Sequence, residues 1–364
     1  MQIHRNHPFL SVAQVRKLFG QLAELKDSGN VKRLHFVWPG GEPLLAGMEF
    51  FQKVVALQRE FFPGEKVYNQ INSNASLLNC EWINFFKDHD FDLIVGLDGP
   101  RDVNFNRRTK TGTEAHQEIM RGVAMIQASG LPLKYISVIT TQVCDRAEYL
   151  YDFALKLHPA TVDYIPCFDA ANIASVENAS YASFMTSIFD LWYNDDSHGR
   201  PKRITTLSSI IEAIAQGETS CCTFLRNCGG RLYMNASGTV RYCCNGYFDN
   251  KFTYLGNIET MSILDQFENK GSTLRRIRER VLELQERCSP CPLFCICGGG
   301  CMTQRPAKAD NPIGLTHYCR ARYSIIRHVL QKLREEGTTP FFAELPPTRE
   351  IPETAPDIEF PPVV

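Results

Sequence analysis

The stretch that decides the fold is "CSPCPLFCICGGGCMTQRPAKADNPIGLTHYC", which runs from Cys288 to Cys319 and contains six cysteines. Three further cysteines, Cys222, Cys228 and Cys243, precede it. Proline and glycine beside the sulfurs in "CSPC" and "CGGGC" indicate tight turns, and turns of this kind present thiolates to a metal. The cysteine pattern therefore predicts metal ligation in the second half of the chain.

Eight of these cysteines form two sets of four, the number of ligands that a tetrahedral zinc site or an iron–sulfur cluster consumes. They are Cys222, Cys228, Cys243, Cys288, Cys291, Cys297, Cys301 and Cys319. Spacing alone leaves two interpretations open, a pair of zinc ribbons and a pair of iron–sulfur clusters. A third, in which the cysteines only fill an apolar core, is disfavoured by the turn residues beside them.

The charge balance of the 364-residue chain excludes some classes of partner. Its 39 lysines and arginines nearly match its 40 aspartates and glutamates, so the net charge of −1 favours neither nucleic acid nor a membrane surface. The N-terminal residues lack the apolar core of a signal peptide, and no run of about eighteen apolar residues occurs, so we expect a cytoplasmic protein. In that reducing compartment, 14 cysteines favour metal ligands or buried thiols over disulfides.

Helical and strand patterns alternate over the first half. A helix is expected after Ser11 as N-cap, with apolar residues at helical spacing from Val12 to Leu25. Strands are expected at 34–38, 66–72, 91–97, 133–141 and 162–168, with helices at about 48–60, 80–89, 114–128 and 148–156 between them and a helical connector at about 181–216. This alternation predicts an α/β protein with a parallel sheet, curled into a barrel or partial barrel, and an active site at the carboxyl ends of its strands.

The cysteine intervals, together with "GTVRYCC" and "YLGNIET" between them, resemble the SPASM domain of radical S-adenosyl-L-methionine (radical SAM) peptide and protein maturases. The resemblance is strongest to anaerobic sulfatase-maturating enzymes and extends from about Leu10 to about Leu333. It implies two auxiliary [4Fe–4S] clusters with interleaved ligands. The first cluster would take Cys222, Cys228, Cys243 and Cys301, and the second would take Cys288, Cys291, Cys297 and Cys319.

The resemblance also implies the domain organisation. Residues 1–217 would form a partial (β/α)6 TIM-like radical SAM barrel without its first strand, followed by its helical connector. Residues 218–333 would form the Cys-rich SPASM domain, and the Pro- and Glu-rich residues 334–364 a flexible tail.

The segment "FVWPGGEPLLAGMEFF" resembles the part of radical SAM barrels that holds the amino group of S-adenosylmethionine at a strand end. Two glycines let a backbone approach a ligand closely, and a carboxylate can bind an ammonium group. The cofactor-binding residues implied by the resemblance are Gly40, Gly41, Glu42, Asn74, Asp98 and Arg108. Taken singly, the last three are equally well explained as turn caps and a surface ion-pair residue.

The chain departs from the family in three respects. It contains no CxxxCxxC motif, which in the family binds the cluster that cleaves S-adenosylmethionine, so either the N-terminus is truncated or that cluster is lost. Cys244 stands where sulfatase-maturating enzymes have an aspartate that acts as the base, and its thiol could take this catalytic role or be inert. Pro39 and Gly96 replace polar residues, so the cofactor pocket is expected to lose side-chain hydrogen bonds.

Two functions from different classes remain. The first is a maturase that oxidises or cross-links a side chain of a peptide or protein through a 5′-deoxyadenosyl radical. Its partners would be a sulfatase or a ribosomally made peptide as substrate and a reducing electron donor. The second is a non-catalytic iron–sulfur protein that binds a peptide or an electron-transfer partner. The substrate itself is not identified, because specificity resides in loops and in the partner rather than in the fold.

Overall fold

The computed structural model describes residues 9–31, 33–109, 112–167, 175–217, 219, 221–224, 231–243, 251–305, 307–308, 311–312 and 314–337. Two predicted site residues, Cys228 and Cys244, and residues 338–364 of the predicted tail lie outside the described residues. Within the described part of the chain, no helix has both the length and the apolar character needed to cross a membrane.

In the described part of the first half, a six-stranded parallel sheet has the strand order β1-β2-β3-β4-β5-β6. Its strands are β1 Leu34–Trp38, β2 Val67–Ser73, β3 Phe91–Gly96, β4 Lys134–Ile139, β5 Thr161–Pro166 and β6 Arg203–Ile204. The helices are α1 Val12–Asp27, α2 Met48–Phe61, α3 Cys80–Asp88, α4 His116–Ser129, α5 Ala147–Leu157, α6 Asn178–Tyr193 and α7 Thr205–Gln216. The predicted alternation of strands and helices is confirmed, and it brings all the carboxyl ends of the strands to one edge of the sheet.

Local sequence explains these elements. Ser11 caps α1 in a capping box, in which its Oγ accepts from the backbone N–H of Gln14 and the Gln14 side chain accepts from the Ser11 N–H. The predicted N-cap is therefore confirmed. In β3, burial alternates with a period of two, and Phe91 packs against Phe86 of α3. The odd-numbered residues of this strand thus face the helices, and Gly96 faces the inner side of the curved sheet.

The expected helical connector at 181–216 is wrong in one respect. Between α6 and α7 lies β6, which pairs with β5 through Thr161–Arg203 and Val162–Ile204. The described sheet therefore has six strands, where sequence patterns predicted five. A strand of two residues is too short to produce an alternating pattern of its own, and only its pairing with β5 defines it.

The described part of the second half contains a small three-stranded antiparallel sheet, a two-stranded hairpin with two residues in each strand, and four α-helices. The strands are β7 Tyr233–Met234, β8 Thr239–Arg241, β9 Tyr254–Asn257, β10 Ala307–Lys308 and β11 Asn311–Pro312. The helices are α8 Ile263–Glu268, α9 Thr273–Glu286, α10 Phe294–Cys297 and α11 Cys319–Glu335. Short 3₁₀ helices are η1 Pro43–Ala46, η2 Asn104–Asn106, η3 Cys222–Phe224, η4 Lys251–Thr253 and η5 Met302–Gln304.

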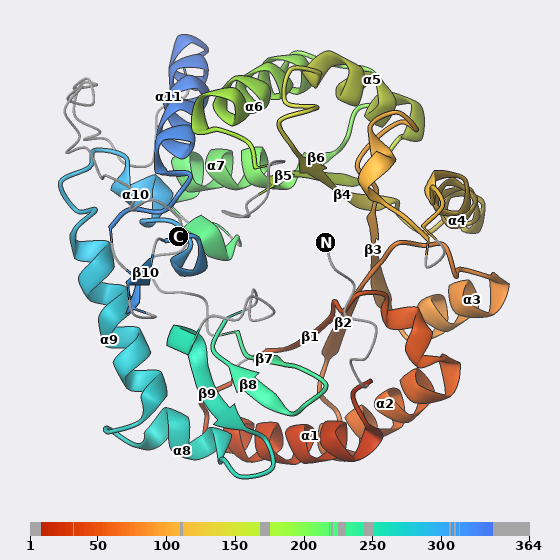
Figure 1. Cartoon of the computed structure of the whole chain (residues 1–364), viewed down its shortest axis with the longest axis vertical. Coiled ribbons are helices and arrows are strands. Elements are labelled where there is room, and N and C mark those ends of the chain that lie inside the picture. Colours follow the sequence, from red (N-terminus) through yellow and green to blue (C-terminus); the bar gives the residue numbers. More distant parts are fainter. Residues whose placement is uncertain are drawn as a thin grey trace.

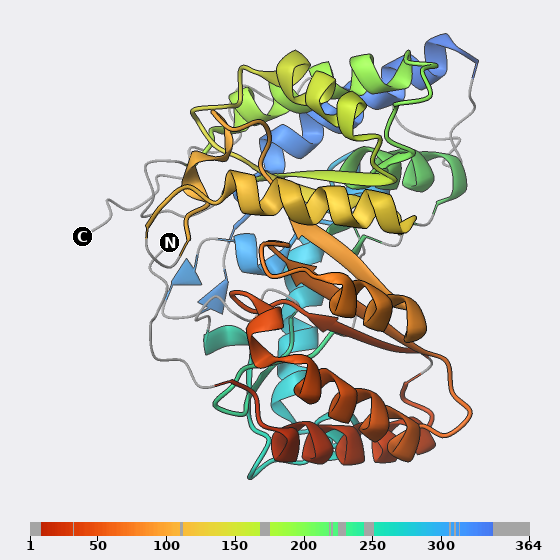
Figure 2. The same cartoon turned by 90° about the vertical axis from the view of Figure 1, so that its right-hand side faces the viewer.

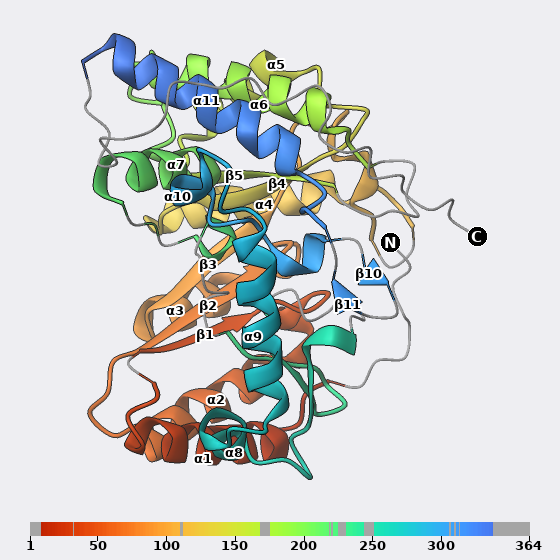
Figure 3. The same cartoon turned by 90° about the vertical axis from the view of Figure 1, so that its left-hand side faces the viewer.

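The second half bridges the two edges of the parallel sheet. Helices α1 to α6 follow one another along the outside of the sheet, and α8 to α11 complete the ring between α1 and α6 (Figures 1 and 2). From the side, α9 runs from α8, next to α1, toward α10, next to α7 (Figure 3). On the β6 side, α11 packs on α6, so Ile326 and Val329 share one core with Phe184 and Ile188.

Helix α1 packs against both halves of the molecule. Val15 and Phe19 pack against Leu57 of α2 in the core beneath β1. Leu25 instead belongs to the core of the second half, together with Val240 of β8. The predicted apolar face of α1 is therefore divided between two cores, and the helix acts as the seam between the halves.

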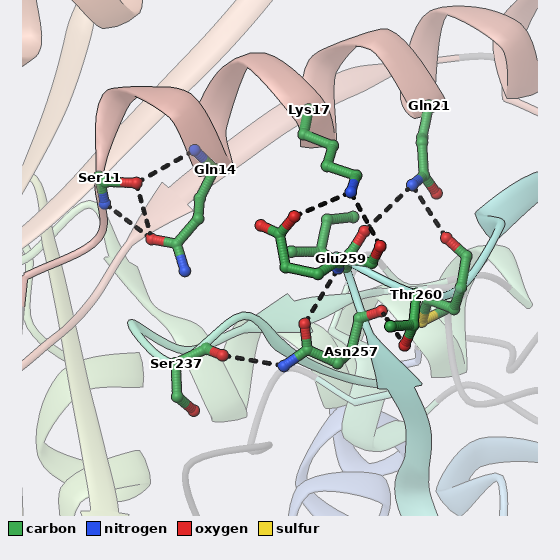
Figure 4. A network of polar contacts seen from close by, with 10 residues as sticks. Ser11, Gln14, Lys17, Gln21, Ser237, Asn257, Glu259 and Thr260 are labelled. Atoms are coloured by element: carbon green, nitrogen blue, oxygen red, sulfur yellow. Dashed lines mark hydrogen bonds and ion pairs between the residues drawn. The ribbon is translucent and has the colours of Figure 1, made fainter.

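Polar side chains of α1 add hydrogen bonds along the same seam (Figure 4). The Gln21 side chain donates to the carbonyls of Ile258 and Met261 and accepts from the N–H of Ile263 at 2.7 Å. Lys17 Nζ lies 2.8 Å from Oε2 of Glu259 in an exposed ion pair. Gln21 therefore satisfies partly buried backbone groups of the second half, whereas the contacts of Lys17, which include the Glu259 carbonyl at 2.9 Å, are exposed to solvent.

These two contacts generate a stability prediction. Replacing Gln21 with Ala removes the side-chain acceptor of the Ile263 N–H, so we expect the free energy of unfolding to fall by about 1–3 kcal/mol. Lys17→Ala is the matched control on the same helix, and its exposed ion pair is expected to contribute about 0–1 kcal/mol. Urea unfolding followed by circular dichroism measures both variants. Equal losses would show that the Gln21 hydrogen bonds add nothing beyond a surface contact.

Candidate functional site

Glu42 occupies the carboxyl end of β1, where the chain turns into η1. The side chain is 9% exposed. Its Oε1 accepts from the Leu44 N–H at 3.1 Å and from Ser73 Oγ at 2.8 Å, and its Oε2 accepts from the Asn74 N–H at 2.8 Å. The carboxylate thus joins the ends of two neighbouring strands, and the structure brings together Glu42 and Asn74, two of the residues singled out from the sequence.

Burial raises the pKa of Glu42, although the hydrogen bonds from Asn74, Ser73 and Leu44 act in the opposite direction. Each carboxylate oxygen can accept two hydrogen bonds, and Oε2 uses one. The group is therefore held in one orientation with capacity left for a further donor, such as an ammonium group.

The two glycines before Glu42 border open space. A Cβ added at Gly40 or at Gly41 would meet no atom within 4 Å. Gly40 also has a φ of +70°, a left-handed conformation that favours glycine. The backbone of this turn is therefore accessible to a ligand that lies next to Glu42.

Asp98 is held at the carboxyl end of β3 and is 6% exposed. Its Oδ1 accepts from Arg107 Nη2 at 2.6 Å and from the N–H of Val138, while its carbonyl accepts from Ser137 Oγ. The ion pair is mostly buried, so the carboxylate and the guanidinium orient each other. Asp98 thereby connects the strand ends of β3 and β4.

Arg107 lies against Gly96. A Cβ at Gly96 would stand 2.5 Å from Nη1 of Arg107, so only glycine leaves room for this guanidinium. The expected loss of a side-chain hydrogen bond at Gly96 stays a prediction, and the Arg107 guanidinium occupies the space beside this glycine. The Nε of Arg107 is a buried donor without a partner in the described part of the chain.

The structure thus brings Arg107 to Asp98, whereas sequence matching selected its neighbour Arg108. The backbone of Arg108 pairs with that of Glu114 in an isolated antiparallel β-bridge. Arg108 also lines a surface cavity of about 570 Å³ beside Phe105 and Tyr149. Adjacent arginines in "FNRR" carry no sequence signal that separates them, because the turn at η2 decides which one faces the sheet. The cofactor-binding role of Arg108 stays a prediction.

Four thiols of the second half share one neighbourhood. Cys288 follows α9, Cys291 lies in the next turn, Cys297 ends α10, and Cys319 begins α11. Burial raises the pKa of Cys319 to about 11, and the thiols of Cys297 and Cys288 act in the same direction. Burial also raises the pKa of Cys291, and the same two thiols raise it further. Charges affect each other in this way only at short range, so these four thiols lie in one region, where Cys295 also acts on Cys291. Their assignment to the second cluster stays a prediction.

This donor set suits a [4Fe–4S] cluster, which is held by four Cys thiolates. Within the described residues, no three His, Cys, Asp or Glu side chains are arranged so as to hold a metal ion. The four thiols are therefore neighbours without a closed ligand geometry. Nη2 of Arg305 lies 3.8 Å from Cys288 Sγ and places a cation beside them, which suits an anionic group.

The first predicted set is described only in part. Cys243 and Cys301 are buried, and Cys222 lies in η3. Cys301 Sγ is 3.1 Å from Thr303 Oγ1. Because Cys228 and the proposed base Cys244 lie outside the described residues, this cluster and its neighbouring base stay predictions.

The chain is similar in sequence to proteins of known activity. No protein-family model matches the chain. A cysteine-type anaerobic sulfatase-maturating enzyme of Clostridium perfringens is 26% identical over 306 residues, which cover 82% of each chain. A serine-type anaerobic sulfatase-maturating enzyme of Bacteroides thetaiotaomicron is 24% identical over 329 residues, which cover 84% of this chain and 78% of the relative.

Solved structures show the same fold. Native anSMEcpe with bound AdoMet has a TM-score of 0.79 at 23% identity, covering 90% of this chain and 89% of that one. Streptococcus suis SuiB has a TM-score of 0.55 at 14% identity, covering 82% of this chain and 68% of that one. The chain therefore shares the fold of a structure that binds AdoMet. In sequence, it is a homologue of the anaerobic sulfatase-maturating enzymes.

The raised pKa of Glu42 generates a pH prediction. Because the folded-state pKa lies above the ordinary value of 4.5, the contribution of this group to stability is complete below 4.5. It is lost as the pH rises through the folded-state pKa. We therefore expect the stability of the wild type relative to Glu42→Gln to fall as the pH is raised from about 4 to about 7, in urea unfolding at each pH.

Glu49→Gln provides the control for this trend. Glu49 is exposed, and the hydrogen bond from Lys53 lowers its pKa, so its trend with pH has the opposite sign. If the relative stability of the wild type against Glu42→Gln instead rose with pH, the hydrogen bonds to Glu42 would outweigh its burial.

Proposed function

We propose that this protein is a radical SAM maturase of the SPASM type that oxidises or cross-links a side chain of a peptide or protein. The observation that carries the proposal is the buried carboxylate of Glu42, oriented by Ser73 and Asn74 beside the open backbone of Gly40 and Gly41. S-adenosylmethionine would supply a 5′-deoxyadenosyl radical once a cluster of the CxxxCxxC type cleaves it, and this sequence does not contain that motif. A reducing electron donor is a further partner in this proposal.

Residues at the carboxyl edge of the sheet would hold the amino acid part of S-adenosylmethionine. Glu42 accepts hydrogen bonds from its ammonium group, and the Gly40–Gly41 backbone lets the ligand approach. Arg107, whose side chain is partly exposed, would donate to its carboxylate, while Asp98 orients the guanidinium. The positive ammonium group and the negative carboxylate of the ligand would thereby each face an oriented side chain of opposite charge, Glu42 and Arg107.

Two auxiliary clusters are proposed for the second half. Cys288, Cys291, Cys297 and Cys319 would bind the second, and Cys222, Cys228, Cys243 and Cys301 the first. Such clusters accept an electron from the substrate or bind it. Cys244, next to Cys243 in the chain, is proposed as the residue that takes the substrate proton or, in the alternative, as an inert thiol.

The substrate class follows from the relatives. Curated relatives of this chain are named as cysteine-type and serine-type sulfatase-maturating enzymes. Structures with similar folds include anSMEcpe with a Cp18Cys peptide and SuiB bound to the precursor peptide SuiA. We propose a peptide or protein segment as the substrate, with nucleic acid excluded by the balanced charge of the chain.

The metal content tests the cluster proposal. We expect the anaerobically reconstituted chain to bind about eight irons, with broad absorption near roughly 400 nm, as two Cys-ligated [4Fe–4S] clusters require. Cys291→Ala is expected to leave about four irons. Cys80→Ala is the control, because Cys80 is exposed at the start of α3 and belongs to neither set. Stoichiometric zinc without iron would contradict the proposal.

Binding of S-adenosylmethionine tests the choice between the two arginines. Loss of one charge-assisted hydrogen bond from Arg107 is expected to weaken binding by roughly 10- to 100-fold, whereas Arg108→Ala changes it by less than about 2-fold. Equilibrium dialysis with labelled S-adenosylmethionine measures both affinities. Arg107→Ala leaves the buried Asp98 unpaired, so Arg107→Lys is compared with it and both folds are checked by circular dichroism. A loss of affinity confined to Arg108→Ala would show that Arg108, and not Arg107, binds S-adenosylmethionine.

A further inference from the structure

Arg305 is a buried cation in the second half. It follows η5 and is 5% exposed. Its Nη1 donates to the carbonyl of Gly314, and its Nη2 donates to the carbonyl of Gly299 at 2.7 Å and lies 3.8 Å from Cys288 Sγ. Three separate segments of the chain therefore meet at one guanidinium.

No carboxylate balances this charge among the described residues. The acceptors that they offer to Arg305 are two carbonyls and one thiol, and its Nε is buried without an acceptor. Taking an unpaired charge out of water costs several kcal/mol, so buried cations are normally paired. The environment of Arg305 therefore requires an anionic group close to it.

The segments that Arg305 contacts all carry predicted cluster ligands. Gly299 lies in the turn between Cys297 and Cys301, and Gly314 lies five residues before Cys319. Cys288 is itself one of the four thiols that share a neighbourhood. The missing anion is thus accounted for if these thiols are ligands of an iron–sulfur cluster, whose thiolates carry negative charge.

The turn around Gly299 is shaped for this contact. Gly299 has a φ of +85°, so its backbone is left-handed, and a Cβ there would lie 3.3 Å from the Gln285 side chain. Gln285 in turn donates to the carbonyl of Gly298 at 3.1 Å. The carbonyl of Gly299 is therefore held toward Arg305 by the turn itself.

We propose that Arg305 is a positioning residue for the second cluster, and this inference rests on the proposed function. It holds the Gly299 and Gly314 segments in place and raises the reduction potential of the cluster through its N–H group at Cys288 Sγ. A positive charge and a hydrogen bond at a ligand sulfur stabilise the reduced, more negative cluster. The planar fork of Arg serves two carbonyls and a sulfur together, which the ammonium group of Lys does not reproduce.

The test uses the full chain, reconstituted anaerobically, with iron content and an EPR-monitored redox titration as readouts. The variants are Arg305→Gln, Arg305→Lys and the control Arg287→Gln. Arg287 also carries a positive charge and directly precedes Cys288, but it is exposed. Cys291→Ala, which is expected to retain only the first cluster, identifies the signal of the second.

We expect Arg305→Gln to lower the midpoint potential of the second cluster and to leave that of the first unchanged. Arg305→Lys keeps the charge, so its potential is expected between that of Arg305→Gln and the wild type, and Arg287→Gln is expected to match the wild type. Selective loss of the second cluster in Arg305→Gln, rescued in Arg305→Lys with a lowered potential, equally supports the positioning role.

Two outcomes would overturn the inference. Full iron content with both potentials unchanged in Arg305→Gln would show that the guanidinium does not act on a cluster. Loss of both clusters together with the fold, in Arg305→Gln and Arg305→Lys alike, would make Arg305 a purely structural residue. Failure of the cluster part of the proposed function is distinguished separately, because the wild type itself would then bind no iron.

Discussion

The open edges of the parallel sheet are the constraint on which the rest of the structure depends. A parallel sheet is stable when its faces are covered, and unpaired edge strands such as β1 and β6 invite wrong pairing. Here the second half spans from one edge to the other, packing on α1 at the β1 side and on α6 and α7 at the β6 side. The Cys-rich half is therefore part of the architecture of the sheet as well as a carrier of ligands.

The parallel order of the strands creates the polar environment of the site. At the carboxyl edge, Glu42 and Asp98 are nearly buried carboxylates, and a buried carboxylate is tolerated only when hydrogen bonds or a cation satisfy it. Backbone N–H groups and Ser73 satisfy Glu42, and Arg107 satisfies Asp98. These partners come from neighbouring strand ends, so the parallel order of the sheet orients both charged groups before any ligand binds.

In the second half, the buried charge that needs a partner is positive. Arg305 is a buried cation whose described partners are neutral, and burial and neighbouring thiols raise the pKa of Cys319 and of Cys291, which disfavours their thiolates. A cluster that deprotonates the thiols and adds negative charge beside Arg305 would resolve both conditions together. Ligand binding and folding of this half are linked for that reason.

Local patterns in the sequence determined the helices that alternate with strands in the first half, five of the six strands of the parallel sheet, the Ser11 cap and the strand end that carries Glu42. These features depend on periodicity and on neighbours within a few residues, which a sequence displays directly. Tertiary structure alone decided that β6 completes the sheet, that Arg107 rather than Arg108 meets Asp98, and that Arg305 is buried beside Cys288. Each of these depends on contacts between segments distant in the chain, or on how one turn aims a side chain, and neither leaves a periodic signal in the sequence.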